Sequence, residues 1–217
     1  MFSEGTSYRK CLRAEMEVIK YLVTVLAGYL LGSISVSILL SRDVMGGDVR
    51  REGSGNAGAT NMARVYGLKA GILTLAGDVV KSVLSILLGW WLLGDAGIAA
   101  GGIACLLGHC FPVYYSFKGG KGVSVGAAIA FAVDWRVFLI VVGAFAIGAL
   151  LSKKVSLGSL SAAVTISIAA ALFGVSTPRM ILAIATMAIV LFQHRENIKR
   201  LLKGTEPNFK AAKPRKI

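Results

Sequence analysis

The stretch VIKYLVTVLAGYLLGSISVSILL at residues 18–40 decides the fold class, because its only charged side chain is Lys20. A helix needs about 20 predominantly apolar residues to cross the hydrocarbon core of a bilayer. Further apolar runs follow at residues 71–93, 97–115, 123–133, 137–151, 157–173 and 180–192. The pattern predicts an all-α, polytopic membrane protein of about seven transmembrane helices. The run at 123–133 has the length of a buried or re-entrant segment, so the alternative is five full crossings.

Composition agrees with a membrane protein. Of the 217 residues 55% are hydrophobic and 16% are charged, and the mean hydropathy is +0.70. A soluble domain carries about a quarter charged residues. The net charge of +13 is not accompanied by the aromatic and basic modules of nucleic-acid binders, so we expect no nucleic-acid partner. We predict an N-terminal extension at 1–17, a single membrane domain at 18–200 and a basic tail at 201–217.

The charged residues between the apolar runs predict the topology. With seven spans, one side receives residues 41–70, 116–122, 152–156 and the tail, which together hold 17 Lys and Arg. The opposite loops hold only Arg136 and Arg179. The positive-inside rule therefore places the first set in the cytoplasm.

The N-terminus disagrees with this topology. The basic residues Arg9, Lys10, Arg13 and Lys20 would lie outside, and the segment lacks the features of a cleaved signal peptide. Translation that starts at Met16 would remove most of this charge. An intact mass of the native protein that includes residues 1–15 would contradict this hypothesis.

Cysteine and histidine give no sign of a metal or cofactor. Cys11, Cys105 and Cys110 have neither a CxxC spacing nor a ligand spacing with His109 and His194. We expect no disulfide framework, no metal and no cofactor.

The first polar loop, DVRREGSGNAGATN, occupies residues 48–61. Its glycines let backbone N–H groups approach an anion, and Arg50 can hold phosphate oxygens bidentately. Its neutral hydrogen-bonding side chains are Ser54, Asn56, Thr60 and Asn61. The alternative is a flexible loop of turn-forming residues.

The second polar loop is FKGGKGV at residues 117–123, directly before an apolar run. Exposed amides, a helix N-terminus and two ammonium groups together suit an anion. Its residues are Lys118, Gly119, Gly120, Lys121 and Gly122, and they do not match a Walker A motif. A basic turn against lipid headgroups is the alternative, but the two loops together favour phosphate binding.

The third polar segment, QHRENIKR at residues 193–200, follows the last apolar run. His194 and Asn197 share a helix face, and Asn197 can orient the imidazole beside a phosphate. The spacing of Glu196 and Arg200 predicts an ion pair that supports the helix.

Four further polar residues stand at or near apolar runs. Asp78 and Lys81 lie three apart within a span, where ionisable residues usually pair and face a cavity. This pair is either structural or in contact with substrate. His109 is interpreted as a packed, hydrogen-bonded histidine. Ser156, at the start of a span, is able to cap the helix or to contact a ligand.

These segments together resemble the bacterial acyl-phosphate:glycerol-3-phosphate acyltransferases. The resemblance covers nearly the whole membrane domain. It is carried by 32–34, 50–61, 78–81, 108–109, 117–123, 156–158 and 194–198, and the combination of GSGNxGAxN with KGGKG is its specific part.

The resemblance implies transfer of an acyl chain from acyl phosphate to the sn-1 hydroxyl of glycerol 3-phosphate. It implies a bacterial inner-membrane enzyme, a monomer among membrane lipids, with its active-site loops in the cytoplasm. The catalytic residues would be His194, Asn197, Ser54 and Arg50. The substrate-binding residues would be Ser33, Asn56, Asn61, Lys118, Gly119, Gly120, Lys121, Gly122 and Ser156. Either His194 or the donor phosphate would take the hydroxyl proton.

Other classes fit the sequence less well. A transporter or channel would explain the spans, but the chain has no internal repeat. A CDP-alcohol phosphotransferase needs a run of aspartates for metal, and these loops offer only Asp43 and Asp48. The His-x-x-x-x-Asp motif of thioester-using acyltransferases is absent, because Tyr114 and Lys199 stand at the fifth positions.

Overall fold

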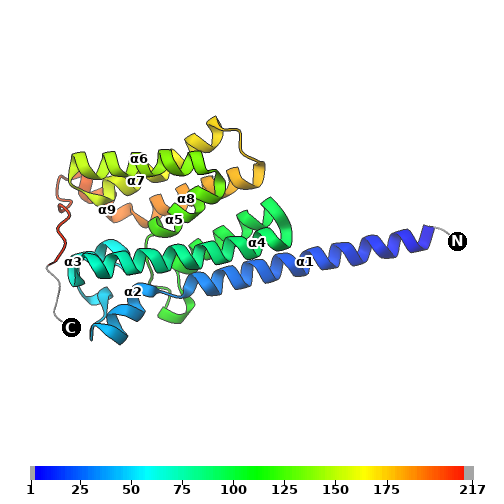
Figure 1. Ribbon diagram of the computed structural model, residues 1–217, viewed down its shortest axis with the longest axis horizontal. Coiled ribbons are helices and arrows are strands. Elements are labelled where there is room, and N and C mark those ends of the chain that lie inside the picture. The colour runs from blue at the N-terminus through cyan, green and yellow to red at the C-terminus, as the bar shows by residue number, and fades with distance from the viewer. Residues whose placement is uncertain (1–2, 213–217) are drawn as a thin grey trace.

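The computed structural model describes residues 3–212, and its regular structure there is entirely helical, as predicted. The α-helices are α1 (Ser3–Ser33), α2 (Val36–Leu39), α3 (Ala59–Tyr66), α4 (Leu68–Cys110), α5 (Val123–Val133), α6 (Trp135–Ser152), α7 (Val155–Leu172), α8 (Thr177–Gln193) and α9 (Arg195–Leu202). The short helical turns are η1 (Leu40–Val44), η2 (Val49–Arg51) and η3 (Val113–Tyr115). Figure 1 shows the long helices lying side by side.

The element α4 is a helical hairpin. Gly94 has φ 58° and ψ −138°, which reverses the chain between two arms. A Cβ added at Gly89 would lie 2.1 Å from the carbonyl oxygen of Gly97, so the backbones of the two arms nearly touch. Glycine is what lets helices pack this closely in a membrane. The arms correspond to the predicted spans at 71–93 and 97–115.

The number of helical segments, as distinct from full crossings, agrees with the sequence prediction of about seven. By length and apolar composition, four of the described helical segments can span a membrane, with α4 counted as one. The pair α8 and α9, bent by 60°, makes a fifth. Counting the two arms of α4 separately and adding α5 gives seven helical segments in the described chain. With 11 residues, α5 rises only about 16 Å, roughly half of the hydrocarbon core.

Helix α1 packs along α4, and glycines again set the distance. Added Cβ atoms at Gly32 and Gly108 would each lie 2.2 Å from a carbonyl oxygen of the other helix, that of Cys105 or Tyr29. The first turns of α1 project beyond the other helices (Figure 1). The helix runs unbroken from Ser3, so the boundary at residue 17 stays a prediction.

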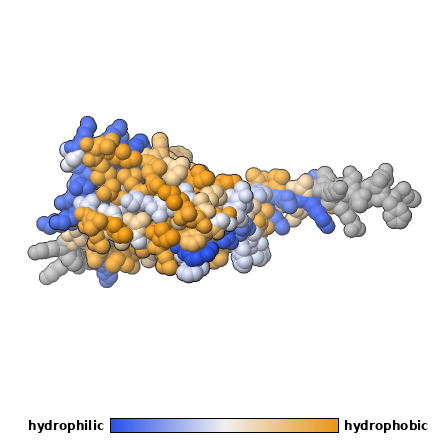
Figure 2. Space-filling model, turned by 90° about the horizontal axis from the view of Figure 1, so that it is seen from above, coloured by the Kyte–Doolittle hydropathy of each residue, from blue (hydrophilic) through white to orange (hydrophobic). Residues whose placement is uncertain are grey.

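The outer surface suits a lipid environment. Large apolar side chains are exposed along the helices, among them Leu22, Trp91, Leu151 and Leu172. Hydrophobic residues cover most of the face seen in Figure 2; hydrophilic ones gather at the end where α3 and the C-terminal segment lie, and others form a patch on the lower edge and lie along the projecting part of α1. The protein is therefore a multi-pass membrane protein with one markedly polar end.

Helix α5 lies in the middle of the bundle. Its residues Val125, Ile129 and Val133 are fully buried and belong to the main hydrophobic core, with side chains from α4 and α8. The second polar loop directly precedes α5, and we call its residues 117–122 the glycine loop. Because α5 is short and central, its N-terminus and the glycine loop lie close to the other polar segments at that end.

Candidate active site

Asn61 holds the first polar loop in shape. Its Nδ2 donates to the carbonyl oxygens of Val49 and Glu52, both at 3.0 Å, and its Oδ1 accepts from the backbone N–H of Ser54 at 2.9 Å. Gly53 has a φ of 59°, and an added Cβ there would lie 2.3 Å from Asn61 Oδ1. The side chain of Asn61 therefore stabilises the backbone conformation of the first polar loop.

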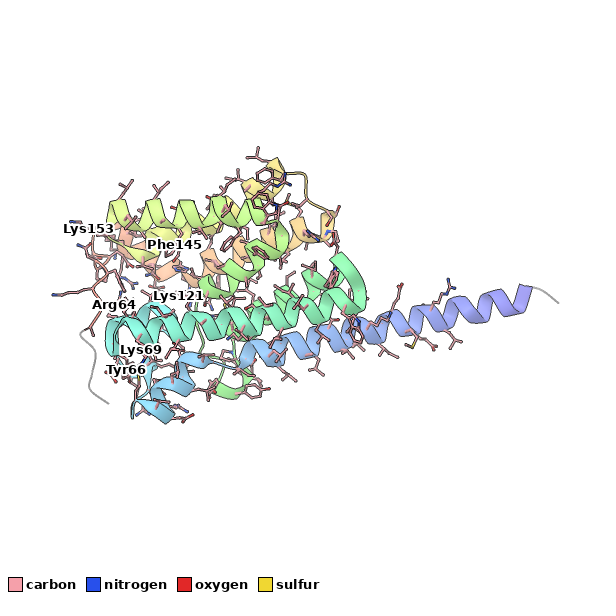
Figure 3. All side chains as sticks on the ribbon, viewed as in Figure 1. Arg64, Tyr66, Lys69, Lys121, Phe145 and Lys153 are labelled. Atoms are coloured by element: carbon pink, nitrogen blue, oxygen red, sulfur yellow. The ribbon has the colours of Figure 1, made fainter. Side chains whose placement is uncertain are left out.

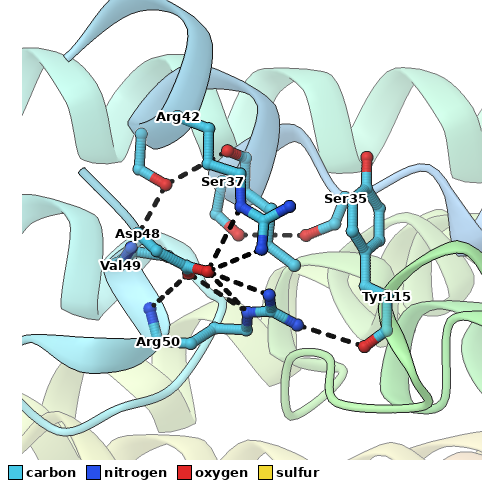
Figure 4. Close-up of polar contacts among 9 residues, drawn as sticks. Ser35, Ser37, Arg42, Asp48, Val49, Arg50 and Tyr115 are labelled. Carbon is cyan, nitrogen blue, oxygen red and sulfur yellow. Dashed lines mark hydrogen bonds and ion pairs between the residues drawn. The ribbon is translucent and has the colours of Figure 1, made fainter. Parts of the chain in front are cut away.

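Arg50 joins this loop to the segment that leads into the second loop (Figure 4). Its Nη2 lies 2.9 Å from Asp48 Oδ2, and its Nη1 donates to the carbonyl oxygen of Tyr115 at 3.1 Å. Asp48 also accepts from Arg42 at 2.8 Å. The hydrogen bond from Arg50 is the largest cause that holds the pKa of Asp48 below its usual range. Arg50 thus has a structural tethering contact, and its catalytic role stays a prediction.

The glycine loop lies directly on His109. The backbone N–H of Gly120 donates to the carbonyl oxygen of His109 at 3.0 Å. An added Cβ at Gly119 would lie 2.1 Å from that oxygen, and one at Gly120 would lie 2.1 Å from His109 Nε2. Gly122, the residue directly before α5, has a φ of 83°. A side chain at position 119 or 120 would push the loop away from His109.

A polar cluster forms where the glycine loop meets the C-terminal segments; we call it the Lys121 cluster. Its members are Lys121, Ser156, Asn197, Arg200 and Glu206. Lys121 Nζ donates to Asn197 Oδ1, and Asn197 Nδ2 donates to Glu206 Oε1 at 2.7 Å. Ser156 Oγ donates to the same oxygen at 2.6 Å, and Arg200 Nε donates to Glu206 Oε2 at 2.7 Å. The cluster thus unites the loop before α5, α7, α9 and the C-terminal segment.

The Lys121 cluster has two cationic side chains, Lys121 and Arg200, and one anionic side chain, Glu206. Burial and then the charge of Arg200 lower the pKa of Lys121 to about 8, and Glu206 acts in the opposite direction. Arg64 and Arg195 add further positive charge near Lys121. Figure 3 shows Arg64 and Lys121 at the same end of the bundle. Such a concentration of positive charge favours binding of an anion.

His194 lies at the junction of α8 and α9 with only 3% of its surface exposed. Burial lowers its pKa to about 4, so the imidazole is neutral at pH 7. Its Nδ1 is 2.8 Å from the carbonyl oxygen of Val190, which can only accept, so Nδ1 carries the proton. Nε2 is then left as an acceptor.

The other predicted site residues lie in different surroundings. Ser33 is buried, and its Oγ donates to the carbonyl oxygen of Tyr29 at 2.8 Å. Ser54 and Lys118 have exposed side chains, and Asn56 is half-buried. Of the predicted site residues, the structure brings Lys121, Ser156 and Asn197 into one cluster. The binding and catalytic roles of all of them stay predictions.

An apolar cavity of about 230 Å³ lies between α4, α5, α6, α7 and α8. Gly122 and Val123, at the end of the glycine loop, line it together with Phe145 and Ile166. Leu75, Ala127, Val141, Val142, Ala162, Ala163 and Val190 complete most of its apolar wall. The glycine loop therefore contacts a cationic cluster and an apolar cavity.

Sequence reasoning missed three features of the site. It gave no role to Glu206, because a lone acidic residue after a helix carries no spacing signal. It treated Arg64 only as one of the basic residues of the loops. The predicted pair of Glu196 and Arg200 is wrong: Glu196 pairs with Lys199 at 3.0 Å, and Arg200 pairs with Glu206. Glu196 pairs with Lys199, which is nearer along the helix, and Arg200 pairs with Glu206, which is the more buried carboxylate.

The fold and the site define a class: an all-helical, multi-pass membrane protein with a cationic cluster beside an apolar cavity at its polar end. This arrangement suits chemistry on molecules that are apolar at one end and anionic at the other. Within the described residues, no three His, Cys, Asp or Glu side chains are grouped to hold a metal ion.

Comparison with known proteins gives the family. The model of the glycerol-3-phosphate acyltransferase family matches residues 22–204. A glycerol-3-phosphate acyltransferase of Syntrophotalea carbinolica is 44% identical over 88% of this chain and 98% of its own. One of Thermoanaerobacter pseudethanolicus is 42% identical over 85% and 93%.

Solved structures agree. The glycerol 3-phosphate form of PlsY (YgiH), an integral membrane glycerol 3-phosphate acyltransferase, superposes with a TM-score of 0.83. It is 35% identical over 88% of this chain and 96% of its own. The lysophosphatidic acid form superposes with a TM-score of 0.81 at 34% identity, over 88% and 95%. The chain belongs to the glycerol-3-phosphate acyltransferase family, of the PlsY type, and is a membrane acyltransferase.

Proposed function

We propose that the protein transfers a fatty acyl group from acyl phosphate to the sn-1 hydroxyl of glycerol 3-phosphate. The products are lysophosphatidate and inorganic phosphate, and the reaction serves phospholipid biosynthesis. The observation that carries the proposal is the position of Lys121 and Gly122, next to each other between the cationic cluster and the apolar cavity. PlsY, solved in its glycerol 3-phosphate and lysophosphatidic acid forms, supports the same acceptor and product.

The acceptor binds through its phosphate at the Lys121 cluster. Lys121 and Arg64 supply positive charge, and Asn197 and Ser156 supply neutral hydrogen-bonding groups. Hydrogen bonds in which a partner is ionised are about twice as strong as neutral ones, so a dianionic phosphate gains most from the two cations. Glu206 already occupies hydrogen-bond donors of this cluster, and it keeps them oriented in the absence of substrate.

The donor places its acyl chain in the apolar cavity and its phosphate near the glycine loop. The cavity keeps the chain among apolar side chains, so a donor that arrives from the bilayer does not expose its methylene groups to water, which would cost about 0.8 kcal/mol for each group. The carbonyl carbon of the mixed anhydride then lies at the boundary between cavity and cluster. This geometry brings donor and acceptor together, which is the main requirement for an already activated acyl group.

In the reaction the hydroxyl oxygen of glycerol 3-phosphate forms a bond to the acyl carbonyl carbon. The bond from that carbon to the phosphate oxygen breaks, and its electron pair leaves with the phosphate. The leaving phosphate accepts the hydroxyl proton, because it gains basicity as the anhydride opens. His194, whose Nδ1–H is held by the carbonyl oxygen of Val190, serves to orient substrate through Nε2.

The membrane arrangement follows the distribution of charge. The basic loops and the Lys121 cluster face the cytoplasm of a bacterial cell, at the inner membrane, and the enzyme works there as a monomer among membrane lipids. Both phosphates are then exchanged with the cytoplasm, and the acyl chain of the product remains in the bilayer. Catalysis needs no metal or cofactor.

The donor is tested with purified protein given palmitoyl phosphate or palmitoyl-CoA, each with and without glycerol 3-phosphate. We expect phosphate release that requires glycerol 3-phosphate, formation of lysophosphatidate, and no product from the thioester. Equal use of palmitoyl-CoA, or phosphate release that ignores the acceptor, would contradict the proposed donor chemistry. Unchanged turnover in chelator is expected, and loss of turnover there would reveal a metal.

A further inference from the structure

A second polar network lies within the membrane-spanning region, beneath the glycine loop, and the proposed reaction does not use it. Its members are Asp78 and Lys81 on the first arm of α4, His109 on the second arm and Ser124 on α5. We call it the buried ion network. The side chains of Asp78, Lys81 and His109 are only 2%, 6% and 3% exposed.

The contacts of Lys81 connect three parts of the chain. Its Nζ lies 2.9 Å from Asp78 Oδ1, 2.7 Å from the carbonyl oxygen of Ile34 and 3.1 Å from His109 Nδ1. Ile34 is in the break between α1 and α2. Nδ1 of His109 also lies 3.5 Å from Asp78 Oδ1, so Lys81 and Asp78 both contact this ring nitrogen. The ion pair thereby fixes the position of the imidazole ring.

Asp78 connects the network to the start of α5. Its Oδ2 accepts from Ser124 Oγ at 2.7 Å, and Ser124 stands two residues after Gly122. The carboxylate therefore links the first arm of α4 to the helix that begins with the glycine loop. Together, Lys81 and Asp78 satisfy each other's charge in a region where an unpaired charge would be costly.

His109 carries the network to the glycine loop. Gly120 bonds to the carbonyl oxygen of His109, and the imidazole ring occupies the space that a side chain at position 120 would need. The next residue in the chain is Lys121, whose ammonium reaches Asn197. The ring of His109 therefore determines where the glycine loop lies, and with it the position of Lys121.

Burying charged side chains between helices costs desolvation free energy. Well-packed apolar residues of similar size usually stabilise as well as a buried ion pair or better. What apolar packing does not supply is directional bonding, and here the bonds converge on the residue under the loop. The directional contacts thus point to a role in placing the loop.

We propose that Asp78, Lys81 and His109 are positioning residues that set the affinity for glycerol 3-phosphate without touching it. They hold the glycine loop where Lys121 completes the anion site. This inference rests on the proposed function, in which the Lys121 cluster binds the acceptor phosphate.

The test measures the Kd of glycerol 3-phosphate by calorimetry on purified protein, without any acyl donor. Asp78→Asn keeps the shape of the side chain and an acceptor for Ser124, but it removes the charge opposite Lys81. We expect the Kd to rise at least about tenfold, because His109 and the loop lose their fixed position. If this variant does not fold, His109→Asn serves instead; it leaves the ion pair intact but removes the ring beneath Gly120, with the same expected rise.

Leu182→Ala is the matched control. Leu182 is fully buried in the main core and lies against Gly102 of α4, outside the network, the cluster and the cavity. We expect its melting temperature to fall and its Kd to stay within about twofold, since only stability depends on this side chain. An equal rise of the Kd in Leu182→Ala would mean that any loss of stability weakens binding, and would overturn the inference.

The outcomes separate the two claims. A folded Asp78→Asn or His109→Asn that binds within twofold of wild type would overturn the positioning role and leave the proposed function intact. Wild-type protein that binds no glycerol 3-phosphate would overturn the proposed function and the inference with it. Wild-type binding without turnover of acyl phosphate would remove only the proposed donor.

Discussion

Lys121 and Asn197 stand 76 positions apart in the chain, yet the ammonium of one donates directly to the side-chain oxygen of the other. Asn197 in turn donates a hydrogen bond to Glu206, which also accepts one from Ser156. A short central helix and a bent C-terminal helix are therefore joined at one point. This joint is the centre of the proposed acceptor site.

The affinity for glycerol 3-phosphate is expected to depend on pH through Lys121. Its pKa of about 8 means that the ammonium is protonated at pH 7 and loses its proton as the pH rises. The second pKa of a phosphomonoester is about 6, so the ligand stays a dianion over this range. If binding requires the ammonium, the Kd should rise about tenfold between pH 7 and pH 9.

The control for this prediction is Lys121→Arg. A guanidinium stays protonated throughout, so its profile should be flat over the same interval even if its affinity differs. A profile in Lys121→Arg that matches wild type would show that another group titrates.

Gly120→Ala should damage the anion site. The new Cβ would lie 2.1 Å from His109 Nε2, so the loop must move. A displacement of about 1 Å at a reacting group costs on the order of a hundredfold in rate, and we expect a loss of that size in kcat/KM for glycerol 3-phosphate. Gly143→Ala on α6 is the control, because no atom lies within 4 Å of its added Cβ. Equal losses in both variants would contradict the close contact with His109.

Glu206→Gln should weaken the fold as well as the site. The carboxylate accepts from Ser156, Asn197 and Arg200, and an amide has one oxygen in place of two. We expect a loss of about 1–3 kcal/mol in the free energy of unfolding, measured as a lower melting temperature in detergent. Glu196→Gln, which removes only an exposed pair with Lys199, should melt like wild type. Similar melting of the two variants would argue against Glu206 as the centre of the cluster.

His194→Asn should retain much of its turnover. Removal of a general base usually costs about 10²- to 10⁴-fold in rate, whereas loss of an orienting hydrogen bond costs less. We therefore expect kcat to fall by less than about a hundredfold in His194→Asn, with a larger loss in His194→Ala. A drop of about 10⁴-fold in both variants would identify His194 as the base and contradict proton transfer to the donor phosphate.

Most of the fold could be predicted from hydropathy. The run at 123–133 coincides with α5, and the runs at 137–151, 157–173 and 180–192 fall on α6, α7 and α8 to within three residues. The break at 34–35 inside the first run was not predicted, because the run is long enough to read as one span; the bond from Lys81 to Ile34 belongs to tertiary structure. The connection at Gly94 was predicted as a loop between spans and is a single glycine reversal.

The site was only partly predictable. Gly-rich and basic loops mark anion binding by composition, and the pairing of Asp78 with Lys81 follows from their spacing and depth. Which cations meet at the site depends on how α3 and α9 pack, and sequence spacing contains no information on that. Arg50 illustrates the difference: its position in a glycine-rich loop indicated phosphate binding, and its guanidinium is bonded to Asp48 and Tyr115.

The most direct test of the account is the kcat/KM for glycerol 3-phosphate of Lys121→Met beside that of Lys69→Met, with lysophosphatidate as the measured product. Lys69 is exposed at the same end of the protein (Figure 3), so the two variants remove the same charge, one inside the cluster and one on the surface outside it. A charge-assisted hydrogen bond contributes about 1.5–3 kcal/mol, so Lys121→Met should lose about 10- to 150-fold and Lys69→Met should stay within about twofold of wild type. Full activity of folded Lys121→Met, or equal losses in the two variants, would contradict the Lys121 cluster as the acceptor site.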